Sequence, residues 1–282
     1  MMRKSIQCDP DFSPKGHVSM KMDRWTSGAD YDQWMGRWSR LLAQEFLEWL
    51  NLPAGLRWLD ACCGSGVITE AIVEHNAPTS VAGVDVSAEQ ISFARQQRSR
   101  PNVTFETADA MALPFPDATF DVAVCGLGLN YIPNPVRGLE EFCRVTRPGG
   151  TLAVYLWDYV RGARFLREFW DAATAIDPEA AALDQALRFP ICTEEGLRNI
   201  FEKAKLEQLS LTAVDIVTRF TSFDDYWEPL LTGQGSAPNY LATRDKQIQS
   251  AIRERLRATL PANAQGAIEL PARAWAIRGR RP

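Results

Sequence analysis

One stretch decides the fold: Leu56-Arg57-Trp58-Leu59-Asp60-Ala61-Cys62-Cys63-Gly64-Ser65-Gly66-Val67-Ile68-Thr69. A short apolar run ends in an acid, and a turn of small residues leads into a helical pattern. A buried parallel strand passes the chain to a helix in this way, across a crevice where ligands bind. Glycine suits such a turn because a side chain would hold the backbone away from a ligand. The stretch predicts an α/β protein with a ligand site after this strand.

The same stretch resembles motif I of the class I S-adenosylmethionine (SAM) methyltransferases, an acid followed by three alternating glycines. Here Asp60 is the acid, Cys62 stands where the first glycine usually lies, and Gly64 and Gly66 follow. The resemblance implies that Asp60, Ala61, Cys62 and Gly64 contact SAM. The change at Cys62 raises the question of whether the turn keeps its usual geometry.

A nicotinamide-binding loop is the nearest alternative, and two features argue against it. Its fingerprint needs a third glycine three residues after the second, where helix and strand pack closely. Thr69 stands there instead. An acid at the strand end would also repel a pyrophosphate, whereas it attracts the amino group of SAM. Asp60 therefore favours SAM over NAD.

Composition limits the class of protein. The 282 residues are 46% hydrophobic and 23% charged, which is ordinary for a globular protein with a sizeable core. The net charge of −4 shows no basic excess of the kind that nucleic-acid binders carry. Six cysteines without a CxxC pair and only two histidines make a metal site unexpected. Without a membrane-length apolar run or a signal-peptide core, we expect a cytoplasmic protein with reduced thiols.

The N-terminal part divides at residue 28. Residues 1–28 are polar and broken by proline and glycine, and we expect a mobile arm. A helical pattern begins at Ala29 and continues to about residue 51, with apolar residues on one side. Its segment Tyr31-Asp32-Gln33-Trp34-Met35-Gly36-Arg37 resembles the cap helix of UbiE-like small-molecule methyltransferases. The resemblance implies that Tyr31 and Arg37 face the carboxylate of SAM, with Arg40 as the alternative to Arg37.

The second strand, Ser80 to Asp85, also ends in an acid. Asp85 follows Asp60 by 25 residues, and in a βαβ unit an acid at this place reaches a ribose. A carboxylate accepts both ribose hydroxyl protons. We therefore expect Asp85 and its neighbour Val86 to contact SAM, with Ser87 and Gln90 as a capping box for the next helix.

Two later segments resemble further cofactor contacts of the family. Asp109-Ala110-Met111 follows the third strand and resembles the adenine segment, in which an acid accepts from the exocyclic amine and apolar neighbours contact the ring. Gly126 and Leu127 begin the segment after the fourth strand, where motif IV lies in the family. They are expected to line the cleft between SAM and the methyl acceptor.

The resemblance implies a Rossmann-like sheet of seven strands, the last antiparallel, with a helical N-terminal cap and helical insertions. The expected divisions are a cap helix over 29–51 and a SAM-binding core over 52–158. Substrate insertions are expected over 159–190 and 221–265, all within one domain. An Arg-Pro-Gly-Gly turn at 147–150 is expected to precede the fifth strand. The aromatic-rich insertion over 221–265 forms either a lid over the cleft or a helical layer on the sheet.

The leading hypothesis is an enzyme that transfers a methyl group from SAM to a small molecule. The alternatives are a SAM-fold binding or regulatory protein without turnover, and a methyltransferase acting on RNA or protein. Tyr131, Asp158 and Tyr159 follow strand ends and are the candidate proton acceptors. His75 is expected at the far end of a helix, away from the ligand edge of the sheet. Neither the acceptor nor the oligomeric state follows from the sequence.

Overall fold

The computed structural model describes residues 28–233 and 235–282. The expected arm over residues 1–28 lies outside the described residues, apart from Gly28, and so does His17. From Gly28 the backbone is helical up to Leu50, as α1 (Gly28–Tyr31), η2 (Asp32–Gly36) and α2 (Arg37–Leu50). The middle element, η2, is a π-helix. The expected helix over 29–51 is thus present, with one π-helical turn inside it.

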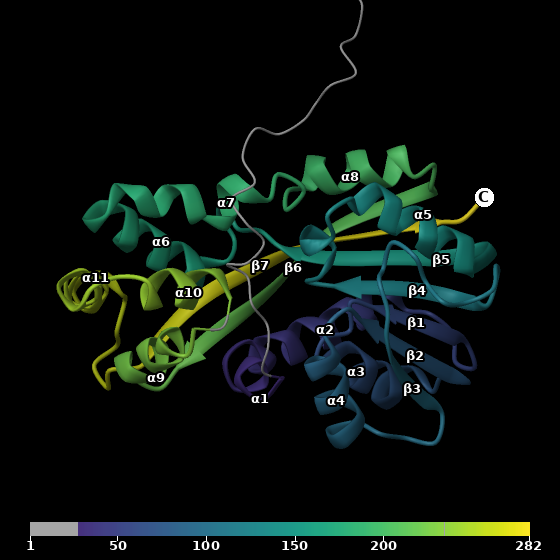
Figure 1. The fold of residues 1–282 in the computed structure, drawn as a ribbon, viewed down its shortest axis with the longest axis horizontal. Coiled ribbons are helices and arrows are strands. Elements are labelled where there is room, and N and C mark those ends of the chain that lie inside the picture. Colours follow the sequence, from purple (N-terminus) through teal and green to yellow (C-terminus); the bar gives the residue numbers. More distant parts are fainter. Residues whose placement is uncertain (1–27, 234) are drawn as a thin grey trace, which may run out of the picture.

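Among the described residues, seven strands form one sheet in the order β3-β2-β1-β4-β5-β7-β6. They are β1 (Arg57–Ala61), β2 (Ser80–Asp85), β3 (Val103–Thr107), β4 (Phe120–Gly126), β5 (Thr146–Trp157), β6 (Glu207–Phe220) and β7 (Ile268–Arg280). The first five pair in parallel, whereas β7 runs antiparallel to both β5 and β6. In Figure 1 the strands β5, β4, β1, β2 and β3 follow one another from top to bottom, with helices around the sheet. The predicted seven-stranded sheet with an antiparallel last strand is confirmed.

The parallel strands are apolar because both faces of the sheet are covered. Within β1, every residue after Arg57 is buried, and β4 is buried over most of its length.

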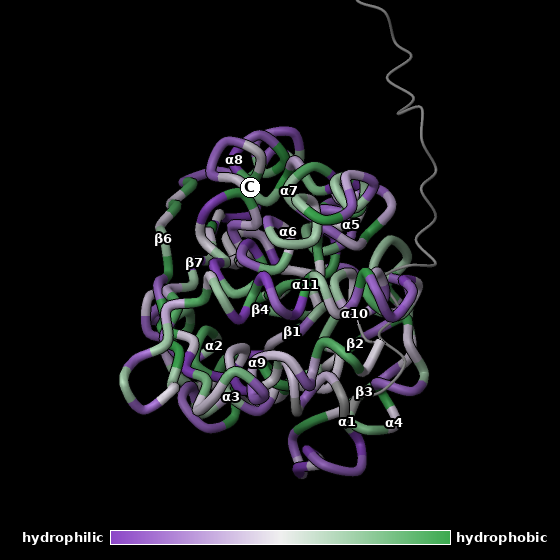
Figure 2. The backbone as a smooth tube through the Cα atoms, turned by 90° about the vertical axis from the view of Figure 1, so that its left-hand side faces the viewer, coloured by the Kyte–Doolittle hydropathy of each residue, from purple (hydrophilic) through white to green (hydrophobic). Residues whose placement is uncertain are grey.

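The helices after η2 and α2 are α3 (Val67–Asn76), α4 (Ala88–Gln97), η3 (Leu129–Tyr131), α5 (Pro135–Val145), α6 (Arg164–Ile176), η4 (Pro178–Leu183), α7 (Gln185–Arg188), α8 (Glu194–Lys203), α9 (Phe223–Trp227), η5 (Glu228–Leu231), α10 (Ser236–Ala242) and α11 (Lys246–Thr259). In Figure 1, α2, α3 and α4 lie below the sheet, and α5 and α8 lie above it. The outer helices carry both hydrophilic and hydrophobic residues in Figure 2, as amphipathic helices do.

The fifth strand departs from the sequence-based prediction. The expected turn at residues 147–150 belongs to β5, and α5 ends at Val145. Phe120 pairs with Thr146, and the next pair is Val122 with Thr151, so residues 147–150 lie opposite Asp121 alone. The turn is therefore a bulge within the strand, because the ladder resumes on both sides of it.

The long hairpin of β6 and β7 carries the C-terminal helices. Residues 216–220 of β6 pair with 268–272 of β7, beyond the last pair that β7 makes with β5, Trp157 with Ala274. Helix α6 packs on this extension of β7 and on α11 (Figure 1). The two segments expected as helical insertions thus meet in one helical layer beside the carboxyl ends of the parallel strands.

Candidate functional site

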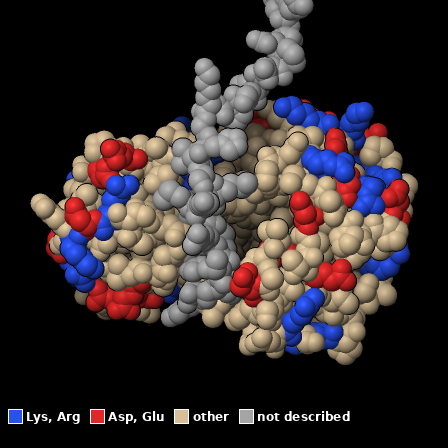
Figure 3. Space-filling view, viewed as in Figure 1, with Lys and Arg blue, Asp and Glu red and all other residues tan. Residues whose placement is uncertain are grey.

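A cavity of about 1200 Å³ lies at the carboxyl ends of β1 to β5. Residues that follow each of these strands form one side of its wall, and the N-terminal helical segment and parts of 182–191 and 235–238 close it. In Figure 3 the surface is hollowed near the centre. Among the described residues that line the cavity, Arg188 is the only Lys or Arg. Ligands of open α/β sheets bind at this edge. All but three of the predicted site residues line the cavity.

Asp60 is the acid at the end of β1, and it is almost fully buried at 1% exposure. Its Oδ2 accepts a hydrogen bond from the Thr69 hydroxyl at 2.6 Å. Its Oδ1 has no hydrogen-bond partner among the described residues. Burial raises the pKa of this carboxyl to about 7. A buried carboxylate oxygen without a partner on a cavity wall fits a positively charged ligand group such as an ammonium.

Cys62 adopts a left-handed backbone conformation at the position where the resembling motif usually has a glycine. Its φ of 58° lies in the left-handed region, which a side chain other than glycine adopts at a cost of roughly 1 to 2 kcal/mol. Gly128 leaves room for its side chain, because a Cβ at Gly128 would lie 2.5 Å from the Cβ of Cys62. A hydrogen bond with Cys125, together with burial, holds the pKa of the Cys62 thiol well above its usual range. The thiol is therefore protonated and not a nucleophile at neutral pH.

Asp85 fixes the loop after β1 to the loop after β2. Its Oδ2 accepts from the Gly64 amide at 2.8 Å and its Oδ1 from the Ser87 amide at 2.9 Å. Burial raises the pKa of this carboxyl. Val86, the next residue, lines the cavity with 76% of its surface exposed. Asp85 thus offers a carboxylate that can accept hydrogen bonds from hydroxyl groups, and Val86 offers an apolar side chain beside it.

The predicted adenine segment forms a turn after β3. Asp109 accepts a hydrogen bond from the Met111 amide at 2.8 Å, and both residues line the cavity together with Ala110. Ala110 is buried and Met111 is partly exposed. The turn presents an acid and apolar side chains to the same part of the cavity as Val86.

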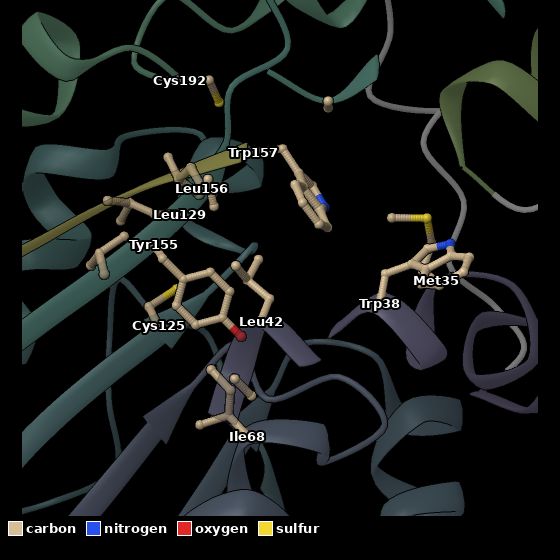
Figure 4. Close-up of a cluster of buried hydrophobic side chains, with 14 of the residues drawn as sticks. Met35, Trp38, Leu42, Ile68, Cys125, Leu129, Tyr155, Leu156, Trp157 and Cys192 are labelled. Atoms are coloured by element: carbon tan, nitrogen blue, oxygen red, sulfur yellow. The ribbon is translucent and has the colours of Figure 1, made fainter. Parts of the chain in front are cut away.

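Gly126 and Leu127 line the cavity at the end of β4. A Cβ at Gly126 would collide with the Ile68 side chain, so glycine is required there by close packing. Figure 4 shows Ile68 and Tyr155 among the buried side chains at this point. The end of β4 thus lies directly against the start of α3.

Tyr31 lies on the cavity wall, and its hydroxyl is 3.0 Å from that of Ser39. Arg37, by contrast, does not line the cavity. Its guanidinium pairs with Asp225 at 2.9 Å and stacks over the Trp38 and Phe220 rings. This placement corrects the expectation that Arg37 faces the SAM carboxylate: the helix turns it toward α9.

Arg40 does not replace Arg37, because its guanidinium pairs with Asp32 on the surface at 2.8 Å. Ala61 is also off the wall, since it is fully buried within β1 and pairs with Val84. Its side chain therefore does not reach the cavity, and the expected contact of Ala61 with SAM stays a prediction.

The candidate proton acceptors separate in the structure. Tyr131 and Tyr159 line the cavity, and both rings lie against Phe189, at 5.1 and 6.1 Å between centroids. Asp158 is buried outside the wall, and its Oδ1 accepts from the Val160 and Arg161 amides. Asp158 therefore holds the turn after β5, which corrects its expected role as a proton acceptor.

His75 lies exposed in the last turn of α3, away from the cavity, as expected. Among the described residues, no group of three His, Cys, Asp or Glu side chains could hold a metal ion. Within the same ranges, none of the helices combines the length and the apolar character that crossing a bilayer requires.

Several wall residues were not predicted from the sequence. Trp34 and Met35 fall on the apolar side of the N-terminal helix, and their spacing indicated only core packing. Arg188 and Phe189 lie between two predicted helices, and Ser236 comes after Gly233 and directly after Gly235 in the sequence. They reach the cavity only because α6 to α11 fold back over the sheet edge, which no local pattern reveals.

Comparison with known proteins identifies the kind of domain to which this cavity belongs. Residues 59–154 match the family described as a methyltransferase domain. The demethylmenaquinone methyltransferase of Staphylococcus aureus (strain JH9) is 28% identical over 200 residues, which cover 67% of this chain and 81% of that protein. Residues 59–154 thus form a methyltransferase domain, in a chain that is homologous to demethylmenaquinone methyltransferase and has class I SAM methyltransferases among its structural neighbours. SAM is the cofactor of this methyltransferase.

Solved structures share the fold of this methyltransferase. Phosphoethanolamine N-methyltransferase 2 of Haemonchus contortus, in complex with phosphomonomethylethanolamine and S-adenosylhomocysteine, aligns over 90% of this chain and 57% of its own. Its TM-score is 0.55 at 15% identity. The [4+2]-cyclase SpnF aligns over 87% and 80%, with a TM-score of 0.53 at 23% identity. These likenesses show the fold alone, because proteins named for different reactions share it.

Proposed function

We propose that this methyltransferase acts on a small-molecule acceptor with a largely apolar body. The observation that carries the proposal is one continuous cavity of about 1200 Å³. Pockets for a single drug-sized ligand span roughly 300 to 1,000 Å³, so this one has room for SAM and a second molecule. The part nearest β4 and β5 is walled mainly by aromatic and aliphatic side chains, including Trp157, Tyr159 and Phe189.

The cofactor half of the cavity contains the acids. We assign Asp60 to the amino group of SAM, Asp85 to the ribose hydroxyls, and Asp109 with Met111 to the adenine. Each acid is held in place, Asp60 by the Thr69 hydroxyl and the others by backbone amides. Such anchoring orients the carboxylates before the cofactor arrives, which lowers the cost of binding.

When bound, SAM supplies a methyl group on a positively charged sulfur, and in-line displacement by the acceptor leaves S-adenosylhomocysteine. The chain contributes mainly by holding the acceptor in line and excluding water. We assign the proton that leaves the acceptor to Tyr131 or Tyr159, because both residues line the cavity. The faces of Trp157 and Tyr159 stabilise positive charge beside them through cation–π contact.

The charge balance supports a small molecule over nucleic acid. The chain has 31 basic and 35 acidic residues, and phosphate backbones are bound by clustered positive charge. On the face shown in Figure 3, the basic side chains do not gather around the hollow.

Methyl-labelled SAM offered to separate metabolite, RNA and protein fractions tests the proposal. We expect label to enter the metabolite fraction with the wild type and with His75→Ala, and not with Asp85→Ala. Label in RNA or protein would replace the small-molecule assignment with a macromolecular one. SAM binding without transfer to any fraction would favour a regulatory protein.

A further inference from the structure

The side chain of Asn130 has an unusual environment. It lies in η3, the short 3-10 helix after β4, and only 8% of the residue is exposed. It lines the cavity, yet neither its Oδ1 nor its Nδ2 has a hydrogen-bond partner among the described residues. Burying an unpaired carboxamide is unfavourable unless a bound group supplies the missing hydrogen bonds.

A second unpaired donor lies on the adjacent strand. Trp157 ends β5, is 1% exposed and lines the cavity, and its Nε1 finds no partner within the described ranges. Figure 4 shows its indole nitrogen on the ring edge that faces Met35. Because Gly126 of β4 pairs with Tyr155 of β5, the two orphaned side chains follow neighbouring strand ends.

Both groups lie on the side of the cavity away from the cofactor acids. Those acids end or follow β1, β2 and β3, whereas Asn130 and Trp157 belong to β4 and β5. Tyr131, next to Asn130, contacts Phe189 of the closing segment. The two residues with unpaired atoms therefore line the part of the cavity that is left for the acceptor.

We propose that Asn130 and Trp157 bind a hydroxyl group of the methyl acceptor. This inference rests on the proposed function of the cavity. A hydroxyl donates its proton to Oδ1 of Asn130 and accepts from Nδ2 of Asn130 or Nε1 of Trp157. A carbonyl would leave Oδ1 unpaired, and an ammonium would leave both N–H groups unpaired.

The neighbouring side chains also favour an uncharged group at this point. An ammonium would need an acid, and the acids that line the cavity in the described part of the chain lie at or after the ends of β1, β2 and β3 or, for Glu89, in the first turn of α4. A carboxylate would seek Arg188, which lies in α7 on the closing segment. The acceptor is thus assigned an apolar body with a hydroxyl directed at η3.

Two probes of similar shape, 2-naphthol and 2-methylnaphthalene, test this assignment. Their affinities are measured by ligand-observed NMR on protein saturated with S-adenosylhomocysteine, for the wild type, Asn130→Leu and Trp157→Phe. Leucine has nearly the shape of asparagine without its polar atoms. We expect Asn130→Leu to reduce the affinity ratio of naphthol to methylnaphthalene about tenfold, and Trp157→Phe to reduce it less. His75→Ala, far from the cavity, is the matched control.

Failures of the inference and of the proposed function are distinguishable. If calorimetry finds no binding of S-adenosylhomocysteine to the wild type, the proposed function fails. If it binds but the affinity ratio is unchanged in both variants, Asn130 and Trp157 do not bind a hydroxyl. Loss of cofactor affinity in a folded Asn130→Leu protein would assign Asn130 to SAM and overturn the inference. Should Asn130→Leu not fold, Asn130→Ala carries the same test.

Discussion

The two halves of the cavity are built in different ways. On the β1 to β3 side, each ligand-facing acid comes at or just after a strand end and is tied to a nearby backbone amide or hydroxyl. On the β4 and β5 side, the wall combines residues near 130 and 157 with segments near 188 and 236. Aromatic edge contacts, such as Trp157 with Phe165 and Tyr131 with Phe189, hold it together.

We interpret this difference by what each half is proposed to bind. A charged, polar cofactor requires carboxylates at fixed positions, and short loops after parallel strands supply them. An apolar acceptor requires shape and exclusion of water, which large side chains from distant segments supply. Substitutions on the β1 to β3 side should therefore change the affinity for the cofactor, whereas substitutions on the β4 and β5 side should change the affinity for the acceptor.

The largest expected effect is in the cofactor half, at Asp85. Asp85→Ala should weaken SAM binding by about 2 to 4 kcal/mol, because it removes charge-assisted hydrogen bonds and releases the Gly64 loop. Calorimetry measures the loss, and a melting curve confirms that the variant is folded. Wild-type affinity in this variant would contradict the division into halves.

At Asp60 the effect should depend on pH. Burial raises the pKa of this carboxyl to about 7 in the free protein, and the ammonium of SAM binds the ionised form. SAM affinity should therefore fall as the pH drops below about 7, by up to about tenfold per pH unit. Asp60→Asn should weaken binding by about 1.5 to 3 kcal/mol at pH 8 and flatten this dependence.

The pH profile also has a control in the same site. The pKa of Asp85 is raised as well, so any slope that remains in Asp60→Asn belongs to Asp85 or to the cofactor. If SAM affinity depends on pH between 5.5 and 8 in the same way in the wild type and in Asp60→Asn, Asp60 does not bind the ammonium.

Gly128 and Cys62 connect the two halves. Gly128→Ala should reduce the free energy of unfolding by about 1 to 3 kcal/mol, because the new Cβ meets the Cys62 side chain. Cys62→Gly in the same chain removes both the collision and the left-handed strain. The double variant should therefore recover most of the loss in urea unfolding.

Gly138→Ala in α5 is the matched control, since its added Cβ would come no closer than 3.0 Å to Ile132. A double variant no more stable than Gly128→Ala alone would show that Cys62 and Gly128 are not coupled in this way.

The smallest effect is expected at Arg37, outside both halves. Arg37→Met breaks a partly exposed ion pair with Asp225 and should cost less than about 1 kcal/mol of stability. SAM affinity should stay within about twofold of the wild type, as in the surface variant Arg40→Met. A tenfold loss of affinity in Arg37→Met alone would return Arg37 to the cofactor site.

The sequence predicts the positions of the acids on the β1 to β3 side because its signals there are local. An apolar run that ends in an acid places Asp60 and Asp85 at strand ends, and the structure brings both onto the wall. Arg37 and Asp158 were misplaced because a helix or turn position does not show which way a side chain points. Asn130 lies in a predicted cleft segment, but only the structure shows that its carboxamide is buried and unpaired.

The most direct test of the division is whether the two halves bind independently. Calorimetry measures the affinity of S-adenosylhomocysteine for the wild type with and without saturating 2-naphthol. We predict that the cofactor product still binds, with a dissociation constant within about threefold of its value without naphthol. An apparent dissociation constant that rises in proportion to the naphthol concentration would mean that both ligands occupy the same space, which contradicts the account.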